Sequence, residues 1–379
     1  LPALAAGDVC APKAPAAPKP AASCCCGCGG QTALPPADFV KMLPDAKLQK
    51  KFAEKKMLAT RNAYGVALLE LGKVNKKVVA LDADVSNSTF SCWFAKQFPD
   101  RYYECRIAEQ NMVSVAVGLA AAGKIPFLSS FAKFLVRAYD QVELATIGGA
   151  NIKIVGSHAG SSLGADGPSQ MSLTDVAFFR SMSEAEGQNG GPVCAVFIPA
   201  DAYAAYKMTE MCVNHAGMTY MRTGRPDVAA IYDAATQFEI GGAIELIQGG
   251  DVTLVSNGYT LHMCKALIPE LAKQGIKAGL VDAYSFPLRS PMLTKMAGDK
   301  RRVLVTVEDN YTGGLGSAVA ELAAAQGGAR VSSVVCRRVP KSAKEAEQCF
   351  DYCHCGASDV LAAVRNALKK GCCGCGSRG

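Results

Sequence analysis

The sequence predicts an α/β protein with two domains, each built on a mainly parallel sheet. Two observations carry this prediction. Short apolar segments alternate with segments of helical periodicity from residue 57 to residue 368, and the segment 78–84 is an apolar run that ends in acidic residues, as a buried parallel strand does. With 379 residues, the chain is long enough for two ordinary domains and an extension. Half of these residues are hydrophobic, so large cores can be buried.

Residues 1–56 are predicted to form an extension and linker. The first 36 residues are rich in Ala, Pro and Cys, contain one acidic residue, Asp8, and show neither a helical nor a strand period. An acid-poor N-terminal region is also compatible with the remains of an organelle-targeting segment. Cysteines cluster at residues 24–28 and 372–375, the second group in a tail predicted over residues 369–379. Adjacent cysteines do not have the spacing of a zinc knuckle, so simple tails are the favoured interpretation.

Composition argues against several classes of protein. Part of the net charge of +7 lies in the two ends of the chain, so we predict no nucleic-acid binding, which would require a basic folded face. The longest apolar run is shorter than the roughly 18 residues of a membrane span, and no membrane association is predicted. The central cysteines lie among apolar segments, as buried reduced thiols would, which favours a cytoplasmic location or, alternatively, the plastid stroma. These cysteines are Cys92, Cys105, Cys194, Cys212, Cys264 and Cys336.

The first predicted domain covers residues 57–230. Its helices are expected at residues 59–69, 113–122, 136–147 and 202–213, and its strands at residues 78–84, 126–130, 152–156, 194–198 and 218–222. The helix at 113–122 consists of small and apolar residues and is predicted to be buried. Residues 183–192 are expected to form a surface loop.

The second predicted domain covers residues 235–368. Strands are expected at residues 252–256, 278–281, 302–307 and 332–336, and helices at 261–274, 316–325 and 358–368. The sequence has no internal repeat, although both domains can share one architecture.

Two features point to chemistry. Glu109 stands at the entrance of the predicted buried helix, where a carboxylate is costly unless it has a use, although a helix N-terminus also favours a negative charge by its dipole. Residues 156–171 follow a strand and are rich in glycine, which permits tight turns around a ligand. This loop also supplies three polar side chains, His158, Asp166 and Gln170.

Five motifs together resemble the transketolase family over residues 57–368. They lie at residues 59–65, 87–91, 107–112, 156–171 and 307–311. The resemblance is to the pyrimidine-binding and C-terminal domains, in the form found in animals and in split bacterial or archaeal enzymes. It implies a thiamine-diphosphate-binding domain with a parallel sheet, followed by a C-terminal α/β domain.

The resemblance also implies an activity and its cofactors. Transketolases use thiamine diphosphate and Mg²⁺ or Ca²⁺ to move a two-carbon ketol group between sugar phosphates, in the pentose phosphate pathway and the Calvin cycle. Glu109 and His158 are the expected catalytic residues, and Glu109 would bind N1′ of the aminopyrimidine so that the ring adopts its imino tautomer. Phe131 and Phe134, expected on one helical face, would pack against that ring. Asp84 matches an acid near the cofactor, with a strand-end charge as the alternative.

Substrate contacts follow from the same comparison. Arg61, Ser88, His158 and Arg222 match positions that hold the terminal phosphate of the sugar, for which Arg offers a fixed fork of donors. Asp166 matches a contact to a sugar hydroxyl. Gln170 stands where part of the family has His, near the ketol end of the substrate.

The sequence lacks the Gly-Asp-Gly motif and following Asn that bind the diphosphate and metal in this family. We therefore expect a pyrophosphate-binding half, as a separate subunit or a missing segment, in a homodimer or heterotetramer, with the metal ligands on that half. Two alternatives are a subunit of another thiamine enzyme, such as deoxyxylulose-phosphate synthase, and a non-catalytic structural or regulatory relative. Residues 87–90 and 167–171 favour transketolase over the synthase.

Overall fold

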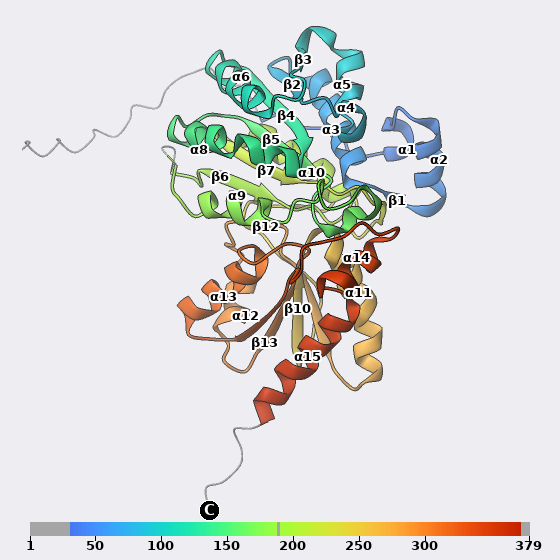
Figure 1. The fold of residues 1–379 in the computed structure, drawn as a ribbon, viewed down its shortest axis with the longest axis vertical. Helices are drawn as coiled ribbons and strands as arrows, with labels where there is room; N and C mark the ends of the chain where they lie inside the picture. Colours follow the sequence, from blue (N-terminus) through green and yellow to red (C-terminus); the bar gives the residue numbers. More distant parts are fainter. Residues whose placement is uncertain (1–30, 188–189, 373–379) are drawn as a thin grey trace, which may run out of the picture. The chain divides into compact units, whose positions relative to one another are not determined.

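Two sheets, one of seven strands and one of five, form the framework of the protein in a computed structural model that describes residues 31–187 and 190–372 (Figure 1). Most neighbouring strands in both sheets run parallel, which confirms the predicted α/β class. A short antiparallel pair, β1 (Met57–Leu58) with β8 (Val228–Ala229), brings the two ends of the first predicted domain together.

The seven-stranded sheet has the order β12-β6-β7-β5-β4-β2-β3. Its parallel strands are β2 (Val78–Asp82), β3 (Tyr102–Glu104), β4 (Ile125–Phe131), β5 (Lys153–Ser157), β6 (Cys194–Phe197) and β7 (Met218–Arg222). The seventh, β12 (Ser285–Phe286), pairs antiparallel with β6 and comes from the second half of the chain. A strand from the second predicted domain therefore completes the sheet of the first.

Helices cover both faces of this sheet because its strands are apolar on both sides. Helices α3 (Thr60–Val74) and α10 (Ala202–Asn214) share a core with Phe127 and Val155. Helices α6 (Glu109–Ala121), α8 (Tyr139–Ile147) and α9 (Asp175–Ser183) share the other core with Leu128 and Ile154, the strand neighbours of those residues.

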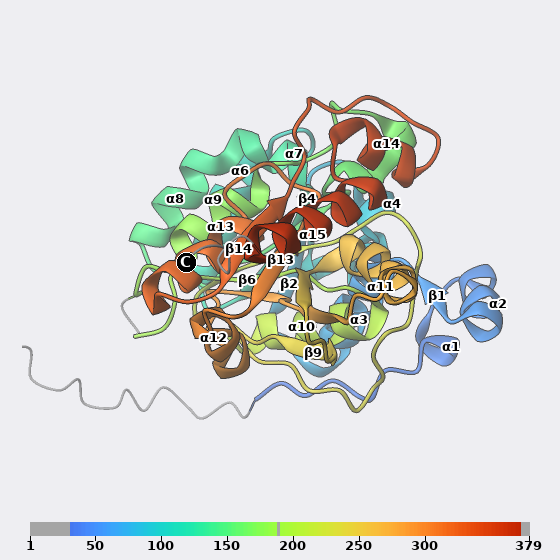
Figure 2. The same cartoon turned by 90° about the horizontal axis from the view of Figure 1, so that it is seen from below.

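The five-stranded sheet repeats this arrangement in the order β14-β13-β10-β11-β9. Its strands are β9 (Ile244–Ile247), which is antiparallel, and β10 (Val252–Ser256), β11 (Ala278–Asp282), β13 (Val303–Val307) and β14 (Arg330–Val334). One face packs on α11 (Gly258–Lys273) and α15 (Ala357–Cys372), the other on α12 (Pro291–Gly298) and α13 (Leu315–Gln326). Figure 2 shows α11 and α12 on opposite sides of these strands.

Residues 39–55, assigned from the sequence to the extension and linker, contain two helices, α1 (Phe39–Met42) and α2 (Ala46–Lys55). The Asp45 carboxylate caps α2 by accepting from two backbone N–H groups. Phe39 and Phe52 are buried and lie 5.2 Å apart, ring centre to ring centre. Tertiary packing therefore orders a segment whose own sequence pattern is weak.

Other differences are local. Helix α15 continues through Cys372, four residues beyond the predicted end, and β14 begins two residues before the predicted strand. Short helices that the sequence analysis did not predict include α4 (Ser86–Thr89), α5 (Cys92–Gln97), α7 (Ala132–Leu135) and α14 (Ala346–Cys353). The cysteine cluster at residues 24–28 lies outside the described residues. Of the central cysteines, Cys92 and Cys105 are half-buried and the other four are buried, all as free thiols.

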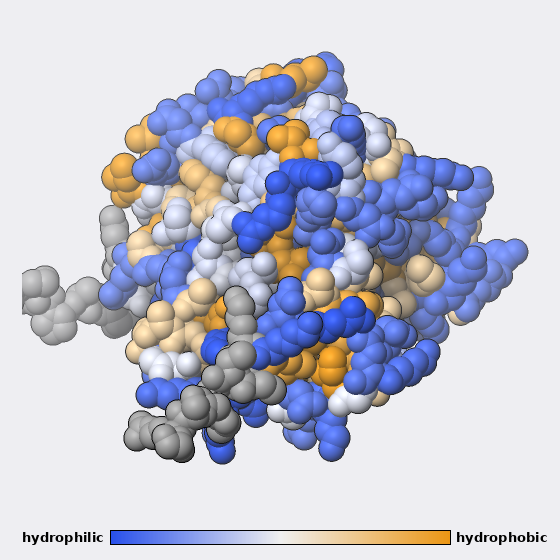
Figure 3. Space-filling model, turned by 60° about the horizontal axis from the view of Figure 1, so that its bottom comes forward, coloured by the Kyte–Doolittle hydropathy of each residue, from blue (hydrophilic) through white to orange (hydrophobic). Residues whose placement is uncertain are grey.

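The prediction that residues 113–122 form a buried helix is confirmed only in part, because α6 buries one face. Val113 and Ala116 are buried, whereas Gly118, Ala121 and Ala122 are exposed. On the face of the molecule that Figure 3 shows, hydrophobic residues gather in separate patches between hydrophilic ones. Within the described residues, none of the helices has the length and apolar character required to cross a membrane.

Candidate active site

Several candidate residues follow neighbouring strands of the seven-stranded sheet. Strands β7, β5, β4 and β2 are adjacent and parallel, so their carboxyl ends lie at one edge of the sheet. Arg222 and Phe131 are the last residues of their strands, and His158 directly follows β5. Ligands of open parallel sheets bind at this edge.

Glu109 is the first residue of α6 and is only 2% exposed. Its two carboxylate oxygens, Oε1 and Oε2, each accept from Nη1 of Arg137 at 3.0 Å. Arg137 lies in a 3₁₀ turn, Val136–Ala138, and its side chain is 57% exposed. The sequence analysis missed this partner because 28 residues separate it from Glu109. A buried carboxylate at a helix N-terminus is thus paired with a cation that reaches into solvent.

Phe134 and Phe131 extend the series of contacts that begins with Glu109 and Arg137. The Arg137 guanidinium carbon lies 5.7 Å from the centre of the Phe134 ring, which stacks on Phe131 at 4.9 Å. Phe131 ends strand β4 and Phe134 belongs to α7, so the prediction that both lie on one helical face is wrong. The sharp change from strand to helix nevertheless brings the two rings together. Phe131 also stacks on His158 at 3.9 Å.

His158 is buried and has a left-handed backbone conformation, with φ of 56°, which is uncommon for a residue other than glycine. Its Nε2 lies 3.3 Å from Nη1 of Arg61 and its Nδ1 lies 2.8 Å from Oγ of Ser157. Because a guanidinium can only donate, Nε2 accepts and the ring hydrogen is on Nδ1. Burial, with Arg61 and Arg225 nearby, lowers the pKa of His158 to about 3. The imidazole is therefore neutral near pH 7.

Arg61 lies in the first turn of α3, and its Nη1 also donates to the backbone oxygen of Ser88 at 2.9 Å. Its guanidinium carbon lies 5.1 Å from the centre of the Phe90 ring. Nε of Arg61 is buried and has no hydrogen-bond partner among the described residues. Burial, followed by repulsion from Arg225, lowers the pKa of Arg61 to about 10. A cation in this position would be stabilised by an anion.

Arg225 is the functional candidate that the sequence analysis missed. Its Nε lies 3.5 Å from Oδ2 of Asp166, the polar residue predicted from the glycine-rich loop. Its side chain is 40% exposed and its charge acts on both Arg61 and His158. The segment 222–225 contains two arginines, and the phosphate contact was assigned from the sequence to the first of them, Arg222.

Arg222 lies in a different environment, at the contact between the two sheets. Its side chain is 6% exposed, and Nε donates to Oδ2 of Asp175 at 3.0 Å. Nη1 donates to Oδ1 of Asp309 at 2.7 Å, and Nη2 donates to Oδ1 of Asn310 at 2.6 Å. Burial alone would lower the pKa of Arg222, but Asp175 and Asp309 raise it above its usual value. Each of these three nitrogens is engaged by the protein, so the geometry does not favour Arg222 as a phosphate ligand.

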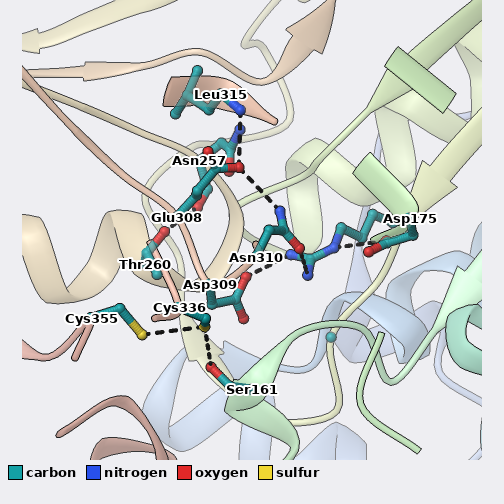
Figure 4. A network of polar contacts seen from close by, with 12 residues as sticks. Ser161, Asp175, Asn257, Thr260, Glu308, Asp309, Asn310, Leu315, Cys336 and Cys355 are labelled. Atoms are coloured by element: carbon teal, nitrogen blue, oxygen red, sulfur yellow. Dashed lines mark hydrogen bonds and ion pairs between the residues drawn. The ribbon is translucent and has the colours of Figure 1, made fainter. Parts of the chain in front are cut away.

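The network extends into the second sheet (Figure 4). Asn310 donates to Glu308, whose carboxylate accepts the backbone N–H groups of Leu315 and Gly316 at the start of α13. On the other side, Gly160 has φ of 80°, and a Cβ at this position would overlap the Asp309 carboxylate. This glycine of the loop thus makes room for the second domain, whereas the sequence analysis explained the loop's glycines by a ligand.

Asp84 and Gln170 do not join the chain of contacts. Asp84 is exposed, and its backbone N–H donates to Oε1 of Glu104 at 3.1 Å. The buried acid at this strand end is Asp82, which accepts from Thr89 and has a pKa raised to about 7 by burial. Gln170 is half-buried in a turn, with its backbone N–H donating to Gly167.

The arrangement can bind two kinds of group. A buried carboxylate beside stacked aromatic rings fits a flat nitrogen heterocycle, such as the aminopyrimidine of thiamine diphosphate. Arg61 and Arg225, which both lie near the neutral His158, fit an anion such as a phosphate. In the part of the chain that the structure describes, no group of three or more His, Cys, Asp or Glu side chains is arranged to hold a metal ion.

Comparison with known proteins gives two family matches. The profile described as "Transketolase, pyrimidine binding domain" matches residues 56–230, and "Transketolase, C-terminal domain" matches residues 241–353. Mouse transketolase-like protein 2 is 42% identical over 83% of this chain, and human transketolase is 42% identical over 76% of it. These matches cover 49% and 46% of the two relatives, so the chain spans about half of their length.

A solved structure described as "Split gene transketolase, inactive beta4 tetramer" is similar in extent to this chain. It is 36% identical, the TM-score is 0.69, and the match covers 82% of this chain and 98% of that one. The similarity to a transketolase of Campylobacter jejuni, at 20% identity with a TM-score of 0.69, concerns the fold alone.

Proposed function

The chain belongs to the transketolase family, and from this premise we propose that it is the pyrimidine-binding and C-terminal half of a transketolase. The proposed reaction is the transfer of a two-carbon ketol group between sugar phosphates with thiamine diphosphate as cofactor. The observation that carries the proposal is one unbroken series of contacts. It runs through Glu109, Arg137, Phe134, Phe131, His158, Arg61 and the backbone of Ser88.

Glu109 is the proposed partner of the pyrimidine ring. Its burial fixes the carboxylate in one place, and Phe134 and Phe131 offer flat apolar surface beside it. When bound, thiamine diphosphate would supply the carbanion chemistry that ketol transfer requires. The protein's part is to orient the ring by a hydrogen bond between Glu109 and the ring and to keep water from it with the two aromatic side chains. Asp84, which is exposed, stays a weaker candidate for cofactor binding.

The sugar phosphate is the proposed ligand of the cationic end of the site. Arg61 and Arg225 supply the charge, and the neutral His158 accepts a hydrogen bond from Arg61 and so orients its guanidinium without adding a charge of its own. We propose Arg225 in place of Arg222 because the Arg222 donors are already bonded to Asp175 and the second domain. Asp166, Ser88 and Gln170 stay proposals as contacts to the sugar or its phosphate.

A pyrophosphate-binding half is the proposed partner, and it would supply the ligands for Mg²⁺ or Ca²⁺. Exposed apolar side chains on this part of the fold support this. Ile107 stands two residues before Glu109, and Leu144 and Ile147 lie on α8, which packs on α6; they are exposed by 70%, 57% and 72%. Large exposed apolar side chains are typical of interfaces. The proposed assembly is a homodimer of joined halves or a heterotetramer of separate ones.

The proposal can be tested by mixing this chain with the pyrophosphate-binding half of a split transketolase. The mixture should transfer ketol groups from a ketose phosphate to an aldose phosphate, and Glu109→Gln should lower kcat at least about a hundredfold. Glu54→Gln, which changes an exposed carboxylate on α2, serves as the matched control and should leave the rate unchanged. An unchanged rate in Glu109→Gln would contradict the role of Glu109. A mixture that binds sugar phosphate without turnover would favour a non-catalytic relative.

A further inference from the structure

We propose that Arg137 is a positioning residue that holds Glu109 in the free chain and must release it when the cofactor ring binds. The inference rests on the proposed function, since it concerns the carboxylate to which the aminopyrimidine would hydrogen-bond. The new element is a competition, in which the guanidinium of Arg137 and the cofactor ring compete for the Glu109 carboxylate.

The geometry of the ion pair supports the competition. One nitrogen of Arg137, Nη1, lies 3.0 Å from both Oε1 and Oε2 of Glu109, so it engages the whole carboxylate. Glu109 is 2% exposed and cannot turn toward another ligand without leaving its buried position. Each oxygen has a second lone pair, but the carboxylate is buried and the exposed Arg137 covers the approach to it, so a ring that hydrogen-bonds to Glu109 competes with Arg137.

Arg137 is able to leave because most of its side chain reaches into solvent. It is 57% exposed, and its charged head can move into water at small cost while the aliphatic stem stays in place. The guanidinium carbon lies 5.7 Å from the centre of the Phe134 ring. Arg137 thus contacts both the carboxylate and the aromatic stack, the two groups that we propose for the pyrimidine ring.

The free chain in turn has a reason to keep the contact. A buried carboxylate without a partner is costly, and the dipole of α6 offsets only part of that cost. If Arg137 stabilises the free state and contributes nothing to the bound state, its removal raises the free energy of the free state alone. Linkage then requires that the variant chain be less stable and yet bind the cofactor more tightly.

The experiment compares Arg137→Met with Arg137→Lys and the wild type. Met keeps an unbranched apolar stem without the charge, and Lys keeps the charge without the fork of donors. For the chain alone, we would measure the thermal midpoint and the hydrogen exchange of the hydrogen-bonded backbone amides at residues 112–116. For the complex with a pyrophosphate-binding half, we would measure the Kd of thiamine diphosphate by calorimetry.

We expect Arg137→Met to lower the midpoint, speed exchange at residues 112–116 and lower the Kd about fivefold or more, with Arg137→Lys closer to wild type. An unchanged or higher Kd together with lower stability would mean a purely structural role and would overturn the inference. Unchanged exchange in the free chain would overturn it as well. A wild-type complex that binds no thiamine diphosphate would instead contradict the proposed function, and the exchange data would still decide whether Arg137 holds Glu109.

Discussion

Arg222 donates through Nη1 to Oδ1 of Asp309 at 2.7 Å, and this bond connects the end of strand β7 to the segment that follows strand β13. Both side chains are almost completely buried. The pair therefore connects the seven-stranded sheet to the five-stranded sheet.

Breaking this pair should destabilise the protein strongly. Arg222→Met leaves the Asp175 and Asp309 carboxylates buried without their cation, so we expect the free energy of unfolding to fall by about 3–5 kcal/mol. Arg225→Met, three residues away, removes a partly exposed ion pair and should cost less than about 1 kcal/mol. Urea unfolding of both variants measures the difference. Equal losses would mean that the contact between the sheets does not depend on Arg222.

Arg225 should decide recognition of the phosphate group. In the complex with a pyrophosphate-binding half, Arg225→Met should weaken binding of a pentose phosphate by about 10- to 100-fold, because a charge-assisted hydrogen bond is lost. Binding of the corresponding unphosphorylated pentose should stay the same, which provides the control. Calorimetric titration with both sugars tests this. If both affinities fell alike, Arg225 would act on the sugar or on the fold, and the phosphate assignment would fail.

His158 should make the fold sensitive to acid. Its pKa is about 3 in the folded protein and about 6.5 when unfolded, so below pH 6.5 the unfolded chain takes up a proton that the folded chain does not. The loss of stability that results from this proton uptake is absent above pH 6.5 and grows as the pH falls. From pH 7 to pH 5 it amounts to about 2 kcal/mol. Urea unfolding at both values should therefore show a smaller loss for His158→Gln than for the wild type, and equal losses would contradict a buried neutral His158.

Gly160 should tolerate no side chain. Alanine there would adopt a left-handed conformation and collide with the Asp309 carboxylate, so Gly160→Ala should cost about 3 kcal/mol or more. Gly123 has nearly the same φ, 79°, with no atom within 4 Å of the added Cβ, so Gly123→Ala should cost only about 1 kcal/mol. Chemical unfolding of the pair separates collision from backbone strain. Equal costs would show that Asp309 can move away.

Much of the fold could be predicted from the sequence because most strands are short apolar segments between amphipathic helices. The elements that were missed have a different cause. Helices α1 and α2 are held by contacts of Phe39 and Phe52 with α10, which no local pattern reveals. The exposed face of α6 was missed because small apolar residues, such as Gly118 and Ala121, look alike in a core and on a surface.

The site was predictable where one loop or one turn carries it, and less so where distant residues meet. His158 and Asp166 come from one glycine-rich loop. Arg137, however, reaches Glu109 only because the 3₁₀ turn that follows α7 packs beside α6. Arg222 and Arg225 could not be distinguished in the sequence, since the choice depends on which of them faces Asp309 once the two sheets have packed together.

The central claim, that this chain contributes half of a thiamine-dependent site, is tested most directly by native mass spectrometry. The chain would be measured alone and mixed with a pyrophosphate-binding half, in each case with thiamine diphosphate and Mg²⁺. We predict that the mixture forms a complex that retains one thiamine diphosphate for each copy of this chain, and that the chain alone retains none. Retention of the cofactor by the chain alone, or its absence from the mixture, would contradict the claim.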